Sequence, residues 1–155
     1  MHMNAPHKEE AGWLSSANTK IINSENDYGE YFLKPLETQQ ELGIIQQIKL
    51  PLRVKPQLYY IPEMITRYFP LYDTRTNVYY TLEFRQPIDY DAGALSPKTY
   101  SGVFIHLSGE YPNSPQITYR TNLVNYELSG MDYETPLLQV GESFKDSANN
   151  YEISL

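Results

Sequence analysis

The segment NVYYTLEFRQP, residues 77–87, predicts the strand around which the rest of the fold is arranged. On one side of an extended chain its side chains are all apolar: Val78, Tyr80, Leu82 and Phe84. On the other side they are mostly polar: Tyr79, Thr81, Glu83 and Arg85. A period of two in β-branched and aromatic residues is typical of a strand, and Pro87 ends it because proline has no N–H to give to a sheet. We expect the apolar side to line a hydrophobic core.

Glu83 and Arg85 project from the same side of this strand, roughly 6.5 Å apart along it. Two uses of the carboxylate stay open. It can form an ion pair with Arg85 that braces the sheet, or it can be one of the two carboxylates of a glycosidase. The glycosidase needs a cleft, a second close carboxylate and a Glu83 that faces solvent, so we predict the structural ion pair.

The composition favours a single domain rich in β-structure. The chain has 155 residues, enough to bury a core, and 41 % of them are hydrophobic. Tyrosine is abundant, with 15 residues, and suits half-buried sheet faces. Tyrosine rings also stack on sugars, so a carbohydrate-binding or adhesion module stays open as an alternative. Its candidate surface comprises Tyr79, Tyr90 and Tyr100.

Charge and residue usage exclude several classes of function. The formal net charge is −7, from 19 acidic and 12 basic residues, which disfavours nucleic acid as a partner. The absence of cysteine excludes disulfides and thiolate metal sites. No apolar run approaches the length of a membrane span, and the first residues lack the pattern of a signal peptide. The sequence therefore indicates either a cytoplasmic protein or a piece of a longer one.

Short segments with turn residues between them predict a mostly-β fold, either a β-sandwich or a jelly roll of antiparallel sheets. A short helix is expected over residues 4–13, capped by Asn4, ended by Gly12 and anchored by Trp13 and Leu14. Besides the strand at 77–87, strands are expected over residues 19–23, 30–33, 42–50, 100–107, 116–128, 137–140 and 151–155. Prolines interrupt residues 51–76, which we interpret as an insertion folded over the sheet.

No motif of a known catalytic or metal site is complete in this sequence. His2 and His7 are five residues apart, which does not fit one face of a helix, and His106 is remote from both. Asp89 and Asp91 have the alternate spacing of calcium ligands, but the full calcium-loop pattern is absent, so an ordinary acidic loop is the other interpretation. A nucleophilic serine elbow and a glycine-rich phosphate loop are also absent. We therefore predict no catalytic residue, and calcium as the only candidate cofactor of the chain itself.

Several segments in order resemble the C-terminal part of gametolysin-like and immune-inhibitor-A-like zinc metallopeptidases. The matching segments are NAPHK (4–8) with GWL (12–14), YYTLEFRQP (79–87), GVFIHL (102–107), and LQVGESFKD (138–146) with YEI (151–153). In that family, a short helix ending in Gly-Trp follows the Met-turn and closes the catalytic domain. Residues 51–76 match nothing in the family.

The resemblance implies a remnant of the closing helix at residues 1–14 and a β-sandwich domain at residues 15–155, with the insertion at about 51–76. The family's zinc motif, H-E-x-x-H-x-x-G-x-x-H, lies before the first matching segment and is absent here. The resemblance therefore implies a non-catalytic domain, with zinc held elsewhere in the parent protein. Its expected partners are the catalytic domain and a protein substrate, and its expected location is extracellular, with the signal outside this sequence. Cut from its partner, the helix should leave Trp13 poorly covered or covered by another copy of the chain.

Overall fold

The computed structural model describes residues 4–23, 28–54, 76–86, 102–110, 119–123 and 137–155. Within them the fold is mostly strands, with one short α-helix, α1 (Ala5–Glu10), and one 3₁₀ turn (Ser16–Asn18). The strands of the larger sheet are β1 (Thr19–Ile21), β2 (Gln47–Pro51), β3 (Thr76–Phe84), β4 (Gly102–Glu110), β5 (Tyr119–Leu123) and β6 (Leu137–Gln139). A hairpin follows, made of β7 (Ser143–Asp146) and β8 (Tyr151–Ser154). Among the described residues, no helix is long and apolar enough to cross a membrane.

The larger sheet has the order β1-β2-β3-β4-β5, and β6 pairs with the beginning of β4. β1 runs parallel to β2, and the other pairs are antiparallel. The predicted strand at 77–87 is β3, in the middle of this order. In its register, Leu82 lies between Ile48 and Ile105, and the neighbouring Thr81 lies opposite His106.

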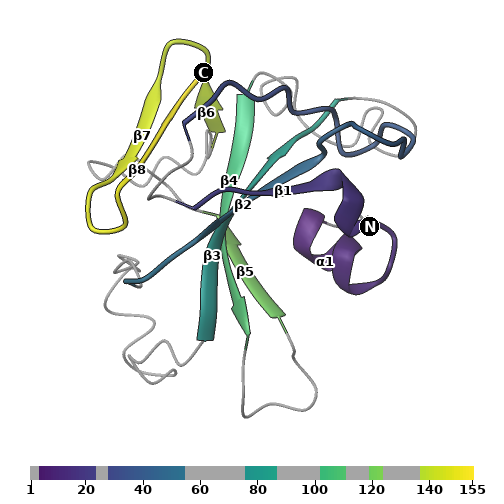
Figure 1. Cartoon of the computed structure of the whole chain (residues 1–155), viewed down its shortest axis with the longest axis horizontal. Helices are drawn as coiled ribbons and strands as arrows, with labels where there is room; N and C mark the ends of the chain where they lie inside the picture. Colours follow the sequence, from purple (N-terminus) through teal and green to yellow (C-terminus); the bar gives the residue numbers. More distant parts are fainter. Residues whose placement is uncertain (1–3, 24–27, 55–75, 87–101, 111–118, 124–136) are drawn as a thin grey trace, which may run out of the picture.

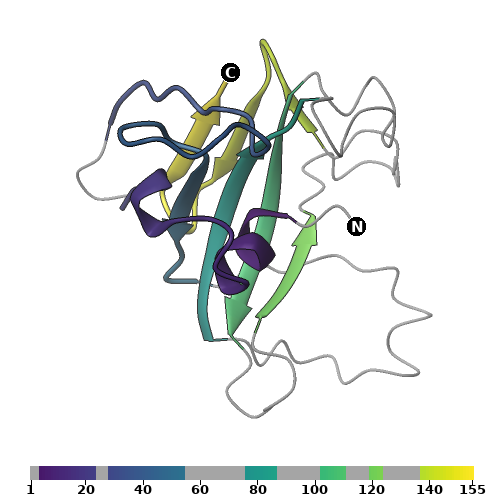
Figure 2. The ribbon, with the colours of Figure 1, turned by 90° about the vertical axis from the view of Figure 1, so that its right-hand side faces the viewer.

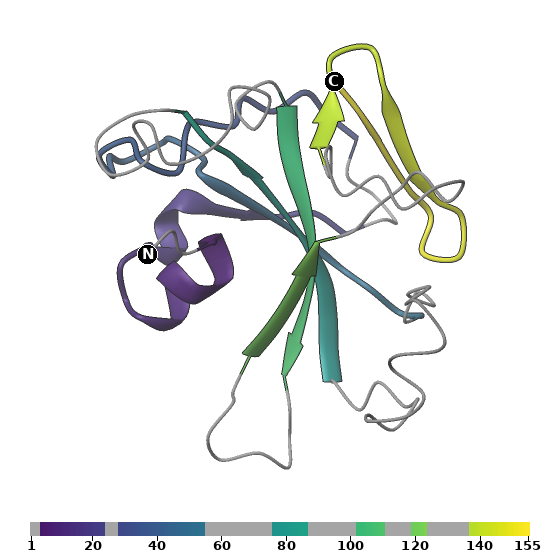
Figure 3. The same ribbon diagram turned by 180° about the vertical axis from the view of Figure 1, so that it is seen from behind.

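The apolar face of the sheet packs against the β7–β8 hairpin and forms the main core. Figures 1 and 3 show the hairpin on one side of the sheet and α1 on the other. The ring of Tyr80 meets that of Phe144 edge to face, with 5.3 Å between the centroids. The core comprises Ile22, Ile48, Leu50, Val78, Tyr80, Leu82, Val103, Ile105, Leu107, Leu138, Phe144 and Tyr151. The expected apolar side of the strand at 77–87 thus lines this core, with Phe84 half-buried at its edge.

Helix α1 lies across the opposite, polar face of the same sheet (Figure 2). The side chain of Asn4 accepts a hydrogen bond from the His7 N–H and so caps the helix, as predicted. Gly12, with φ of +75°, carries the chain out of the helix, where a left-handed residue is needed. Only a small apolar cluster accompanies the helix, made of Ala5, Leu14 and Leu36. Of the two predicted anchors Leu14 is buried, whereas Trp13 is 62 % exposed.

The structure corrects several predicted boundaries. Residues 30–33 do not form a strand, since only Leu33 pairs, in a single bridge with Ile45. β2 begins at Gln47 and not at residue 42, and β4 continues through Glu110. β7 was not among the expected strands. The mostly-β prediction is confirmed, whereas the sandwich remains a prediction, since the second sheet has two strands within the described residues. Residues 55–75 of the expected insertion lie outside them.

Candidate functional site

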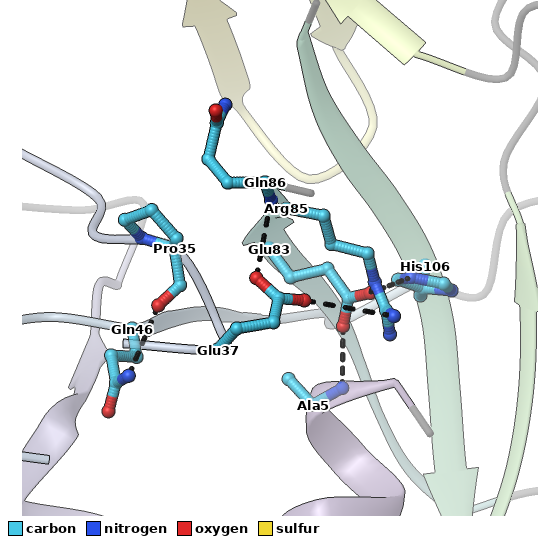
Figure 4. A network of polar contacts seen from close by, with 8 residues as sticks. All are labelled: Ala5, Pro35, Glu37, Gln46, Glu83, Arg85, Gln86 and His106. Atoms are coloured by element: carbon cyan, nitrogen blue, oxygen red, sulfur yellow. Dashed lines mark hydrogen bonds and ion pairs between the residues drawn. The ribbon is translucent and has the colours of Figure 1, made fainter. Parts of the chain in front are cut away.

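Glu83 is the centre of a buried polar cluster between the sheet and α1 (Figure 4). The alternation of β3 points its side chain away from the apolar core, and α1 covers it so that Glu83 is only 1 % exposed. The N–H of Ala5, at the start of α1, donates to Glu83 Oε2 at 2.5 Å. Arg85 Nε donates to Glu83 Oε1 at 2.9 Å, and His106 Nε2 lies 3.3 Å from the same oxygen. The carboxylate therefore joins α1, β3 and β4.

The predicted pairing of Glu83 with Arg85 is present and extends to a second carboxylate. Arg85 Nη1 lies 4.0 Å from Glu37 Oε1, and both side chains are almost fully buried. The N–H of Gln86 donates to Glu37 Oε2 at 3.2 Å. The N–H of Leu36 donates to the carbonyl of Phe84 at 2.9 Å. These contacts bind the loop around residues 35–38 to the end of β3.

The cluster keeps Glu83 ionised. Burial alone would raise the pKa of Glu83, but His106, Arg85 and the Ala5 N–H oppose it and lower the pKa from 4.5 to about 2. Burial lowers the pKa of Lys8 on α1, and the nearby Glu37 carboxylate partly opposes this effect. A carboxyl group with so low a pKa does not serve as a general acid near neutral pH.

A second polar contact holds the C-terminal end of α1. Glu9 Oε2 lies 2.6 Å from Lys49 Nζ and accepts a hydrogen bond from Gln47 Nε2 at 2.9 Å. Lys49 Nζ also lies 4.8 Å from the centre of the Tyr79 ring, a distance typical of a cation–π contact. Both ends of α1 are thus attached to the polar face through carboxylates.

Some buried polar atoms on the face of the sheet beneath α1 have no hydrogen-bond partner among the described residues. They include Gln47 Oε1 and Thr81 Oγ1. The register places them on neighbouring strands, since Thr81 pairs with His106 and with Lys49, two residues after Gln47. Such atoms are uncommon in folded proteins and mark a strained or functional place.

The site residues predicted from the sequence are not brought together in one place by the described part of the structure. Glu83 faces Arg85 and not solvent, so the condition for a glycosidase carboxylate is not met. Tyr79 is half-buried beneath Lys49. The candidates Tyr90, Tyr100, Asp89, Asp91 and His2 lie outside the described residues. Within the described part of the chain, no group of three or more histidine, aspartate or glutamate side chains is arranged to hold a metal ion.

Sequence reasoning missed three partners of Glu83 and Arg85: His106, Glu37 and the Ala5 N–H. The pair at positions 83 and 85 is local, so its spacing predicts it. The others come from distant segments, and only the β3–β4 register and the docking of α1 bring them in. His106 falls in the strand expected over residues 100–107, which is β4, but nothing in its neighbours marks Glu83 as its partner.

Comparison with known proteins gives no match: no family, no curated protein and no solved structure is detectably similar to this chain.

Proposed function

We propose that this chain is a non-catalytic β domain of a secreted zinc metallopeptidase-like protein, which packs on the protease domain and helps to bind the substrate protein. The observation that carries the proposal is the hydrogen bond from the Ala5 N–H to Glu83. It joins two segments that resemble the metallopeptidases, residues 4–14 and 79–87. Segments that are distant in sequence and match one family in order are expected to meet in space if they belong to one structural unit.

The polar cluster supports a structural role for this unit. Glu83 is ionised and buried, so it holds α1 against the sheet and does not face a substrate. Trp13 follows α1 after Ala11 and Gly12 and is 62 % exposed, while its neighbour Leu14 is buried. A large aromatic ring held at the surface by a fixed backbone is the kind of side chain that dominates protein interfaces. In this proposal Trp13 is the contact to the protease domain.

The first test measures zinc and proteolysis on the chain as it stands. We expect no stoichiometric zinc by elemental mass spectrometry and no hydrolysis of casein. Stoichiometric zinc together with caseinolytic activity would overturn the proposal.

The second test concerns the parent protein and Trp13. The coding sequence upstream of Met1 should contain an H-E-x-x-H motif, and the domain that bears it, expressed separately, should bind this chain. Trp13→Ala should weaken this binding about tenfold or more. Phe32→Ala, at a side chain that is 84 % exposed, is the matched control and should leave binding unchanged. An upstream sequence without the motif contradicts the proposal.

A further inference from the structure

Helix α1 is attached to the sheet in a way that favours its separate opening. It has six residues, far fewer than an isolated helix needs to be stable in water. Within the part of the chain that the structure describes, its apolar support is the small cluster of Ala5, Leu14 and Leu36. Among the described contacts, polar ones hold its two ends, at Glu83 for the first turn and at Lys49 and Gln47 for the last, and the helix also lies against β5. Loss of one end contact therefore removes a large share of what holds the helix.

The polar face of the sheet beneath α1 lowers the free-energy cost of detaching the helix. Gln47 Oε1 and Thr81 Oγ1 are buried without a hydrogen-bond partner among the described residues. A buried polar atom without a partner destabilises the state in which it is buried, and exposure to water removes that penalty. The apolar face offers no such compensation, since its side chains lose burial when they are exposed.

The chain also has a place about which α1 can turn. Gly12 adopts a left-handed conformation directly after the helix. Beyond it the chain is fixed, because Gln40 Nε2 donates to the Trp13 carbonyl at 2.6 Å and the Ser15 N–H donates to Gln40 Oε1 at 2.7 Å. Movement of residues 4–11 about Gly12 leaves this second attachment intact.

We propose that α1 is a lid that opens about Gly12 while the sheet stays folded, and that its opening exposes a polar floor centred on Glu83, Thr81 and His106. Once detached, the six-residue helix loses its hydrogen bonds, so that opening and unravelling occur together. The pairing of Glu9 with Lys49 is the contact that sets how often the lid opens, because it is only partly shielded, with side-chain exposures of 28 % and 19 %. The buried contact of Ala5 with Glu83 sets where the helix returns.

Hydrogen exchange of single amides tests the separate opening. Three amides report on α1. The Ala5 N–H donates to the Glu83 carboxylate, the Lys8 N–H to the Asn4 carbonyl, and the Trp13 N–H, just after the helix, to the Lys8 carbonyl. At low denaturant they should exchange at least tenfold faster than the slowest amides of β3 and β4, with little dependence on denaturant. If the two sets exchange in step at every denaturant concentration, α1 does not open separately and the proposal fails.

The variant Glu9→Gln weakens the contact of α1 with Lys49 without substituting a residue of the sheet. It should speed exchange of the α1 reporters about threefold and leave the β3 and β4 amides unchanged. The matched control is Glu152→Gln, the same change in the exposed pair of Lys145 with Glu152, where the two atoms are 3.1 Å apart. The control should alter neither set. An equal effect of Glu9→Gln on both sets would overturn the proposal.

Chemical modification tests whether the floor is uncovered. Diethyl pyrocarbonate modifies accessible histidines, and peptide mass spectrometry separates His106 from His2 and His7. The side chain of His106 is 8 % exposed in the closed state, so its modification requires the lid to open. Glu9→Gln should speed modification of His106 about threefold, in proportion to the exchange of the α1 amides. An unchanged rate at His106 would show that the floor stays covered.

Discussion

The two faces of the larger sheet are built from the same strands but are held in different ways. On one face, Tyr80 and Ile105 pack with the hairpin in an apolar core. On the other, the adjacent residues Thr81 and His106 belong to a polar layer covered by α1. Both faces are buried, so the alternation in residues 77–87 separates an apolar interior from a polar one and not an interior from solvent.

The difference decides which face of the sheet is more sensitive to a single substitution. Apolar contacts are non-directional and add up over area, so the loss of one group is shared by its neighbours. Each buried charge or polar atom on the other face needs a partner in the right geometry. When one partner is removed, the group that it was bonded to stays buried without a partner. The polar face should therefore respond most strongly to a single substitution.

Glu83→Ala should have the largest effect on stability. It removes the buried carboxylate to which Arg85 Nε and the Ala5 N–H donate, which costs about 3–5 kcal/mol of the free energy of unfolding. Urea denaturation followed by far-ultraviolet circular dichroism measures the loss. Glu152→Ala, in the exposed pair, is the control and should cost less than about 1 kcal/mol. A loss at Glu83 as small as that of the control would mean that the polar face is not held by this carboxylate.

The second effect is a loss of stability in acid. The pKa of Glu83 is about 2 in the folded chain, below the ordinary value of 4.5 that applies to the unfolded chain, so the unfolded chain binds the proton more tightly. The stabilisation is complete above about pH 5 and falls as the pH drops from 4.5 towards 2, by about 3 kcal/mol in total. Unfolding by urea across this range should show the fall in the native chain and a flatter profile in Glu83→Gln. Parallel profiles would assign the acid sensitivity to other carboxylates.

Much of the fold follows from local pattern, and the rest depends on contacts that a pattern does not contain. The alternation in residues 77–87 predicts a strand and its core face, and Asn4 and Gly12 predict the ends of the helix. The run of residues 30–33 also looks like a strand, yet Phe32 is 84 % exposed and only Leu33 pairs. A strand needs a partner of matching register, and no property of the run itself supplies one.

The site divides in the same way. Glu83 and Arg85 are two residues apart, so their pairing is local and predictable. His106 reaches Glu83 only because the register sets Thr81 opposite it, and Ala5 only because α1 docks. The hairpin strand Ser143–Asp146 was missed because its alternation covers four residues, and its pairing with β8 is what makes it a strand.

Asn149→Ala, at the edge of the apolar face, should cause the third-largest loss of stability. The side chain of Asn149 accepts hydrogen bonds from the N–H groups of Arg53 and Val54 and donates to the Val54 carbonyl and to Asp146. It thereby fastens the β7–β8 turn to the chain that leaves β2. Its removal strands two backbone donors and should cost about 2 kcal/mol. Ser147→Ala, at an exposed position in the same turn, should cost less than about 0.5 kcal/mol. Equal effects of the two variants would mean that the apolar contacts alone hold the hairpin.

Thr81→Val should have the smallest effect, and it should raise the free energy of unfolding where the other substitutions lower it. Thr81 is fully buried and its hydroxyl has no partner among the described residues, so Thr81→Val removes an unsatisfied group and keeps the shape of the side chain. We expect the free energy of unfolding to rise by up to about 1 kcal/mol. Ile105→Val, at an equally buried position on the apolar face, removes one methylene and should lower it by about 1 kcal/mol. Chemical denaturation of both variants side by side measures the difference. A loss on Thr81→Val would show that the hydroxyl is bonded in the folded protein, and the polar floor would then have no strain for the opening of α1 to relieve.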